Sequence, residues 1–223
     1  MNIIRRPFRY SEYNIVYWLI GINLLFFVLK LLFGSSIHVF LTVDEHKIPM
    51  SIENAMAMIP FAVMRGWVWS FITYMFMHAD FGHVFFNMFG LFIFGVQVER
   101  QMGSKEFLLY YLVTGALAGV FSFVVYYLTG NYIVALVGAS GALFAVQLAY
   151  AIFFPNAILY IWGILPLRAP VMVLAFTVLS LFFIISGRGG NVAHLTHLAG
   201  FGFGWLYFMV RYGINPWRRL TGR

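Results

Sequence analysis

Long apolar segments recur along this chain and constrain its fold more than any other feature. A helix needs about 20 apolar residues to cross a bilayer. We expect membrane-spanning helices at 14–34, 81–98, 107–128, 138–154, 169–186 and 193–212. The fourth and fifth are short, but a short helix can begin below the membrane surface where its end lines a water-filled cavity.

The composition excludes a water-soluble globule. Of the 223 residues, 62% are hydrophobic and only 9% are charged, whereas a soluble domain carries about a quarter charged residues. We therefore predict an all-α, polytopic membrane protein with one six-helix membrane domain. The chain has no cysteine, so disulfides and thiol chemistry are excluded. The first apolar segment is too long for a signal-peptide core, so we expect it to be retained as a span.

The positions of the basic residues predict the orientation. Placing both termini in the cytoplasm puts ten of the fourteen Lys and Arg inside, as the positive-inside rule requires. These ten are Arg5, Arg6, Arg9, Arg100, Lys105, Arg168, Arg211, Arg218, Arg219 and Arg223, whereas Lys30, Lys47, Arg65 and Arg188 fall outside. The net charge of +7 lies at span ends rather than in one run, which argues against a nucleic-acid partner.

This orientation divides the chain into three parts. We expect a cytoplasmic segment at 1–13, the membrane domain at 14–212 and a basic cytoplasmic tail at 213–223. The external loop at about 35–80 carries acidic residues early, but its second half is rich in Met and Trp. We expect that half to lie partly sunk in the membrane interface, with its Trp side chains at headgroup level.

Few polar groups remain at membrane depth, and they limit the possible chemistry. No predicted span has an Asp or Glu in its core, which excludes an aspartyl protease with two carboxylates. No His-Glu-x-x-His metalloprotease motif is present. Ser140 and His197 remain as a candidate nucleophile and its base, because imidazole takes up a hydroxyl proton near neutral pH. Both then lie near the outer face.

Small residues favour close contact between the helices that carry Ser140 and His197. In the fourth predicted span they recur at four-residue spacing, at Gly141, Ala145 and Ala149. Gly200 and Gly204 follow His197 by three and seven residues, and such a face lets two helices approach closely. The alternative interpretation is that Ser140 is another small packing residue and that His197 bonds a backbone carbonyl.

Three further polar residues accompany this pair. His83 and Asn87 are four residues apart, so they share a helix face and could both donate hydrogen bonds to an oxyanion. His194 lies one turn before His197. A zinc site would combine His78, His83, His194 and His197, but no carboxylate or thiolate joins them and the spacing matches no zinc motif.

Four motifs, in this order along the chain, resemble those of rhomboid proteases. The resemblance extends from about Trp67 to Gly204. The motifs are His83-Val-Phe-Phe-Asn87; Glu99-Arg100-Gln-Met-Gly103-Ser104; Gly138-Ala139-Ser140-Gly141; and Ala193-His194-Leu-Thr-His197-Leu-Ala-Gly200, continued by Gly204. Each motif alone is weak, but their common order on matching spans indicates the family.

The resemblance implies a function and a site. It implies a rhomboid-like, six-helix intramembrane serine endopeptidase whose substrates are transmembrane segments of other proteins in the bilayer. Ser140 and His197 would form the dyad, with His83, Asn87 and the Ser140 amide as oxyanion donors. The external loop would be the family's membrane-embedded hairpin, in a bacterial or archaeal plasma membrane. No metal or organic cofactor is implied, and the sequence carries no mark of an oligomeric state.

The chain departs from the family pattern at two positions. The external loop has Trp69-Ser70 where the family often has Trp-Arg, with Arg65 the nearest arginine. Phe144 replaces the frequent Tyr one turn after the nucleophile; it can stack on the base but has no hydroxyl. A non-catalytic, client-binding relative is an alternative, although Ser and His are both present. A small transporter is another, although inverted repeats and intramembrane charges are absent from the sequence.

Overall fold

The computed structural model describes residues 7–34, 36–43, 46–161, 164–186 and 191–221. Arg5, Arg6, Arg188 and Arg223, which we used to predict the orientation, lie outside these ranges, as do Asp44 and Glu45 in the external loop. The α-helices are α1 (Ile15–Phe33), α2 (Ile52–Met56), α3 (Pro60–Val63), α4 (Ser70–Thr73), α5 (Phe81–Gly90), α6 (Val96–Met102), α7 (Ser104–Leu128), α8 (Ser140–Phe153), α9 (Ala169–Ser186), α10 (Asn191–Tyr207) and α11 (Pro216–Leu220). The other helical turns are a 3₁₀ turn, η2 (Tyr74–Phe76), and two π-helical turns, η3 (Leu91–Gly95) and η4 (Phe208–Tyr212).

The long helices coincide with the predicted spans to within a few residues. Among the described residues, four helical stretches are long and apolar enough to cross a membrane. Three of them are the single helices α1, α7 and α9. The fourth is the continuous run formed by α5, η3 and α6. The shorter α8 and the run from α10 to η4 account for the remaining two predicted segments. The protein is therefore a mostly helical, multi-pass membrane protein.

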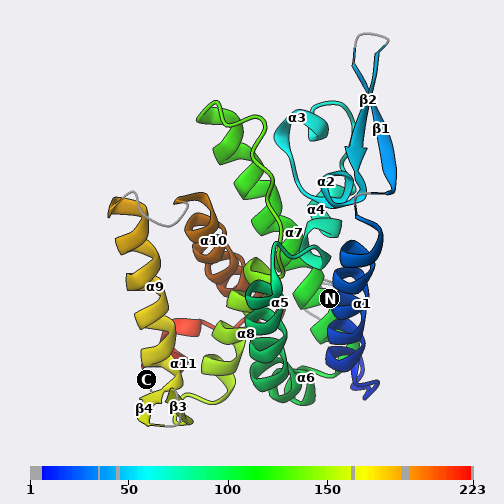
Figure 1. The fold of residues 1–223 in the computed structure, drawn as a ribbon. Helices are drawn as coiled ribbons and strands as arrows, with labels where there is room; N and C mark the ends of the chain where they lie inside the picture. The colour runs from blue at the N-terminus through cyan, green and yellow to red at the C-terminus, as the bar shows by residue number, and fades with distance from the viewer. Residues whose placement is uncertain (1–6, 35, 44–45, 162–163, 187–190, 222–223) are drawn as a thin grey trace.

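Helix α8 begins inside the molecule rather than at its end. Figure 1 shows the chain descending from the far end of α7 into the middle of the bundle before α8 starts. Ten of the 14 residues of α8 are buried, and the helix packs against both α7 and α10. This central position explains why 14 residues suffice for α8, since its first turn does not have to reach the membrane surface.

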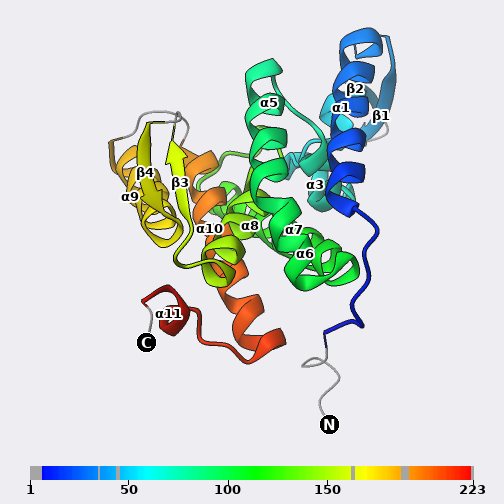
Figure 2. The same ribbon diagram turned by 90° about the horizontal axis from the view of Figure 1, so that it is seen from below.

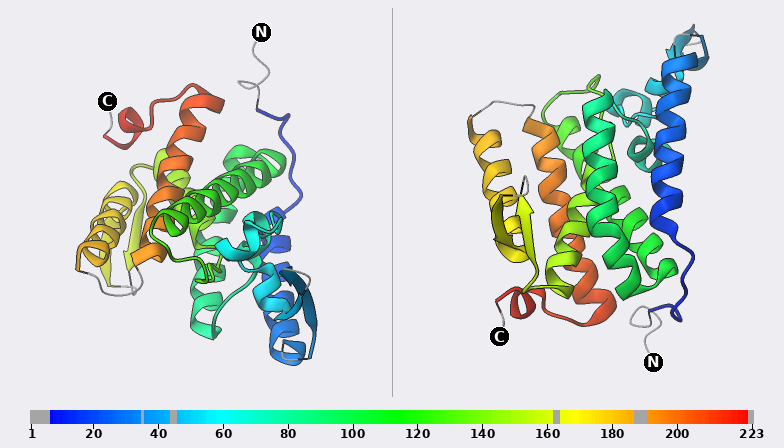
Figure 3. Two further views of the ribbon diagram at one scale, coloured as in Figure 1. Left: turned by 90° about the horizontal axis from the view of Figure 1, so that it is seen from above. Right: turned by 60° about the horizontal axis from the view of Figure 1, so that its bottom comes forward.

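The other long helices surround α8. Helices α1 and α9 lie on opposite flanks of the molecule, and the view from below places α8 between them (Figures 1 and 2). Both flanking helices are apolar yet mostly unburied within the protein, as expected for helices that face lipid. The first described residues and α11 lie at the end of the bundle opposite the β1–β2 hairpin (Figure 3).

Two antiparallel hairpins correct the expectation of an all-α fold. Strand β1 (His38–Val43) pairs with β2 (His46–Ser51) in the external loop, and β3 (Ile158–Ile161) pairs with β4 (Leu165–Arg168) between α8 and α9. Residues of β1 are mainly β-branched or aromatic, which favours a strand. Strands β3 and β4 lie beside α9 instead of extending either neighbouring helix (Figure 3).

The external loop is anchored without an arginine at position 70. Trp69 donates its indole N–H to the Ala55 carbonyl at 3.0 Å, and Thr73 donates its hydroxyl to the Met56 carbonyl at 2.7 Å. The buried Ser70 hydroxyl bonds to a carbonyl within the same turn. The side chains of Trp69 and Thr73 thus tie α4 to α2, while Arg65 stays near its own turn and stacks over a phenyl ring.

Ion pairs and hydrogen bonds of charged side chains connect the helix ends to neighbouring segments. At one end of the bundle, the Lys30 ammonium contacts the Glu53 carboxylate at 2.8 Å, joining α1 to the external loop. At the other end, Glu99 accepts hydrogen bonds from the first two amides of α1, at 2.7 and 3.0 Å, where the helix dipole favours an anion. Arg211 binds Glu106 through two nitrogens, at 2.8 and 3.0 Å, which links η4 to the start of α7.

Candidate active site

Ser140 is the first residue of α8, and backbone hydrogen bonds to two other segments position the residues just before it. Leu136 forms an antiparallel bridge with Met58, and the Gly138 amide donates to the Tyr74 carbonyl at 2.9 Å. Gly138 has a φ of +112°, which L side chains rarely adopt. The chain therefore turns sharply into α8 and presents Ser140, together with the free amides of the first helical turn, inside the bundle.

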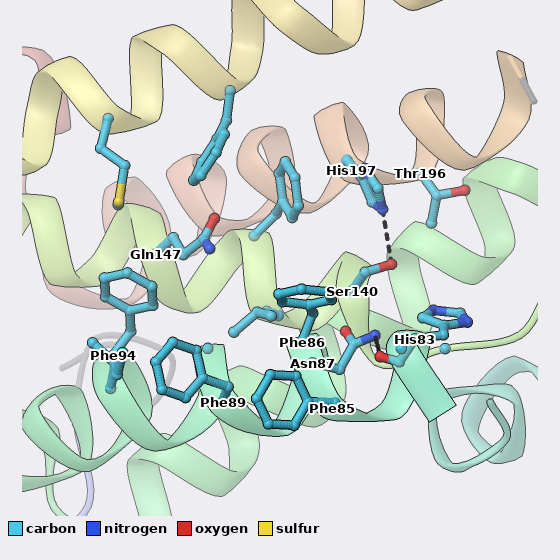
Figure 4. Close-up of a pocket in the computed structure, with 18 of the residues that line it drawn as sticks. His83, Phe85, Phe86, Asn87, Phe89, Phe94, Ser140, Gln147, Thr196 and His197 are labelled. Carbon is cyan, nitrogen blue, oxygen red and sulfur yellow. Dashed lines mark hydrogen bonds between the residues drawn. The ribbon is translucent and has the colours of Figure 1, made fainter. Parts of the chain in front are cut away.

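The structure brings His197 of α10 to this serine. The His197 Nε2 and Ser140 Oγ atoms are 2.8 Å apart, which is hydrogen-bond distance (Figure 4). The close packing of α8 and α10 makes this contact possible. A Cβ atom at Gly200 would lie 2.0 Å from the Gly141 carbonyl oxygen, so a glycine is needed there. Gly204 similarly faces Ala145 and the Tyr110 hydroxyl.

The two histidines on α10 stack on different aromatic side chains. Phe144 stacks on His197 with ring centroids 4.2 Å apart and planes 15° apart. His194 instead stacks on Phe183 of α9, at 4.8 Å and 16°. The structure therefore places His197, and not His194, against Ser140, with Phe144 fixing the plane of its imidazole ring.

His83 and Asn87 approach the same point from α5. The Ala79 amide donates to His83 Nδ1 at 3.4 Å, so the neutral ring carries its proton on Nε2. A Cβ atom at Gly138 would lie 2.5 Å from that Nε2, which places it beside the segment that leads into Ser140. Asn87 is buried and donates one Nδ2 hydrogen to the His83 carbonyl at 2.8 Å, which leaves its second hydrogen available.

The four histidines of the alternative zinc site divide into two pairs. His78 packs edge-on against His83, with ring centroids 5.0 Å apart. Burial, and then the neighbouring His83 ring, lower the pKa of His78 to about 3, so it is neutral at physiological pH. His197 and His194 form the other pair, and His197 Nε2 is at the serine. Within the part of the chain that the structure describes, no three metal-ligating side chains gather at one point.

A cavity of about 1300 Å³ opens beside the serine and histidine. Its walls come from α5, β3, α8, α9 and α10, and most of the side chains lining it are apolar or aromatic (Figure 4). Sequence analysis did not identify four of its polar lining residues, which are Tyr74, Gln147 on α8, Tyr160 on β3 and Thr196. A lone amide within an otherwise apolar span was the available indication for Gln147, whereas Tyr160 enters the wall through a hairpin that we did not predict.

Comparisons with known proteins identify the same region of the chain. Residues 65–213 match the rhomboid domain. The chain is 34% identical over 140 residues to the putative rhomboid protease YdcA of Bacillus subtilis, covering 62% of this chain and 66% of that protein. It is 37% identical over 79 residues to the rhomboid protease GlpG of Haemophilus influenzae, covering 35% and 38% of the two chains. The matched segments thus span at most 66% of these relatives' lengths.

The family match includes every residue that we place around the serine. His83, Asn87, Ser140 and His197 all lie within residues 65–213, as do their supporting glycines and Phe144. The match also covers α5 to α10, which carry these side chains and line the cavity. This multi-pass membrane protein belongs to the rhomboid family.

Proposed function

We propose that the protein is an intramembrane serine endopeptidase that cleaves transmembrane segments of other membrane proteins with a Ser–His dyad. One observation carries the proposal: the 2.8 Å contact between Ser140 Oγ and His197 Nε2, made beside a cavity within a bundle of apolar helices. The names of two relatives, which call them rhomboid proteases, support a protease function. A non-catalytic client-binding protein would not require this contact.

The geometry supports nucleophilic catalysis in two stages. His197 Nε2 accepts the Ser140 proton as Oγ attacks the scissile carbonyl carbon. The imidazolium then protonates the leaving amine, the C–N bond breaks, and an acyl-enzyme ester remains. A water molecule gives a proton to His197 and attacks that ester, and the proton returns to Ser140 Oγ as the acid product leaves. Phe144 keeps the imidazole oriented throughout.

Three donors are available for the oxyanion that forms in each stage. The Ser140 amide lies in the first turn of α8, where amides have no partner within the helix and the helix dipole is positive. Asn87 offers its second Nδ2 hydrogen, and His83 offers its Nε2 hydrogen. Donors fixed in advance in a site of low polarity are among the largest contributions to catalysis of acyl transfer.

We propose a six-span arrangement for residues 14–212, with both termini in the cytoplasm. The described chain ends lie opposite the β1–β2 hairpin, which supports placing the external loop, at about 35–80, on the outer side (Figure 3). The half-buried Ser140 then opens toward the outer face of a bacterial or archaeal plasma membrane. The short helices α2 to α4 form the embedded part of the loop.

A fluorophosphonate probe tests the nucleophile directly. We expect the purified wild-type protein to form one covalent adduct, which peptide mass spectrometry locates at Ser140. Ser140→Ala should lose the adduct, whereas a control variant, Ser180→Ala in α9, should keep it. Labelling that persists in Ser140→Ala would contradict the assignment of Ser140 as the nucleophile.

A further inference from the structure

A buried amide lies in the active-site cavity and has no part in the dyad. Gln147 of α8 is only 6% exposed, and its side chain lines the cavity that contains Ser140. Its Oε1 atom is buried and accepts no hydrogen bond from any residue that the structure describes. Leaving a buried acceptor unpaired is energetically unfavourable, so a ligand that donates a hydrogen bond at this point would recover free energy.

The position of Gln147 defines where such a ligand would lie. Seven residues separate it from Ser140, so both side chains emerge from nearly the same face of α8, about 10.5 Å apart along the helix axis. Figure 4 shows the Gln147 amide further along the cavity from Ser140, in the direction of Phe94. Because α8 begins at Ser140, Gln147 lies deeper in the membrane.

Gln147 is a polar side chain in a cavity with a mainly apolar lining. Phe94 lies on the same side of the cavity as Gln147 (Figure 4), and most of the side chains that line the cavity are apolar or aromatic. In such surroundings a polar group on a substrate would lose its water without gaining a partner unless it reaches a polar side chain such as the Gln147 amide. An amide offers both a donor and an acceptor, and so does a hydroxyl or another amide.

We propose that Gln147 selects substrates that carry a hydroxyl or amide side chain deeper in the membrane than the scissile bond. The inference rests on the proposed protease function and names a specificity residue for it. An extended substrate advances about 3.3 Å per residue, so the selected position is about three residues from the cut. An apolar site with one fixed hydrogen-bonding group discriminates strongly between residues that can and cannot pair with it.

Matched Thr and Val substrates measure this selection, because the two side chains have nearly the same shape. A model transmembrane substrate would carry Thr or Val at each of the positions flanking the mapped cut, on both sides. We expect wild-type kcat/KM to favour Thr by about tenfold at one position on the deeper side. Gln147→Met should bring that ratio near one, and the control Gln101→Met, at an exposed position of α6 outside the cavity lining, should preserve it. Fluorophosphonate labelling of each variant shows whether its dyad is intact.

Three outcomes would overturn the inference. If the wild-type enzyme shows no preference for Thr over Val at any position, that result alone excludes a polar subsite. A Thr preference that is the same in wild type and Gln147→Met would show that a group other than Gln147 makes the selection. A loss in Gln147→Met that is equal for every substrate would assign the hydrogen bond to the substrate backbone. Failure of the wild type to cleave any substrate is a different result, because it would refute the protease function itself.

Discussion

At the scale of single residues, the chemistry depends on which histidine meets the serine. His197 Nε2 lies 2.8 Å from Ser140 Oγ, while His194 stacks on Phe183. We predict that His197→Ala lowers kcat at least about 1,000-fold, since loss of a dyad member removes nucleophile activation. His194→Ala should stay within about tenfold of wild type. Initial rates on a tagged transmembrane substrate distinguish the two, and the reverse pattern would move the base one turn along α10.

Asn87 should act on turnover rather than on substrate binding. Its available Nδ2 hydrogen would meet an oxyanion that exists only along the reaction path, so the interaction should appear in kcat. We predict that Asn87→Ala lowers kcat about 100- to 1,000-fold, and somewhat less if His83 compensates. Steady-state kinetics in detergent micelles provide both constants. A higher KM with unchanged kcat would instead indicate a binding role.

Sequence analysis predicted the residues that the structure brings together around Ser140, but it could not determine their geometry. The glycines after His197 predicted the close helix approach that the structure shows at Gly200. The proton position on His83 was not predictable, because it depends on the Ala79 amide in the preceding turn. Gln147 was missed because a single amide in a span does not reveal whether it faces a helix or a cavity.

At the scale of helices, the contact between α8 and α10 sets the alignment of the dyad. A methyl group at Gly200 would collide with the backbone of Gly141, and overpacking of this kind typically costs about 1–3 kcal/mol. We predict that Gly200→Ala lowers both the Tm and the activity, because the helices must separate. Gly202→Ala is the matched control, since a Cβ atom there meets nothing within 4 Å. Equal Tm values for the two variants would contradict the packing account.

The sequence predicted helices well and strands poorly. Long apolar runs fix a helix in a membrane because every backbone group must be hydrogen-bonded internally, and this explains the agreement over α1, α7 and α9. Strand β1 is mainly β-branched or aromatic, but our expectation for the external loop concerned only its second half, and we predicted no strand in the first. The β3–β4 hairpin is short and apolar, so its pattern is not distinguishable from a span end.

At the scale of the whole molecule, the proposed function predicts that the start of α8 determines where a substrate is cut. We predict cleavage in the outer half of a substrate's transmembrane helix, next to a small residue that fits between glycine-lined helices. The substrate must unwind to expose its carbonyls, so Gly or Pro nearby should increase the rate. Mass spectrometry of the products from a tagged substrate locates the cut. Products cut in the cytoplasmic half, or rates indifferent to added Gly and Pro, would contradict this geometry.

The most direct test of the central claim is proteolysis by Ser140→Ala in reconstituted liposomes. The substitution removes one oxygen atom at the start of α8, so the Tm should stay close to that of wild type. The account predicts that wild-type protein cleaves a transmembrane substrate and that Ser140→Ala is slower by several orders of magnitude. A folded Ser140→Ala protein that cleaves at the wild-type rate would contradict the account.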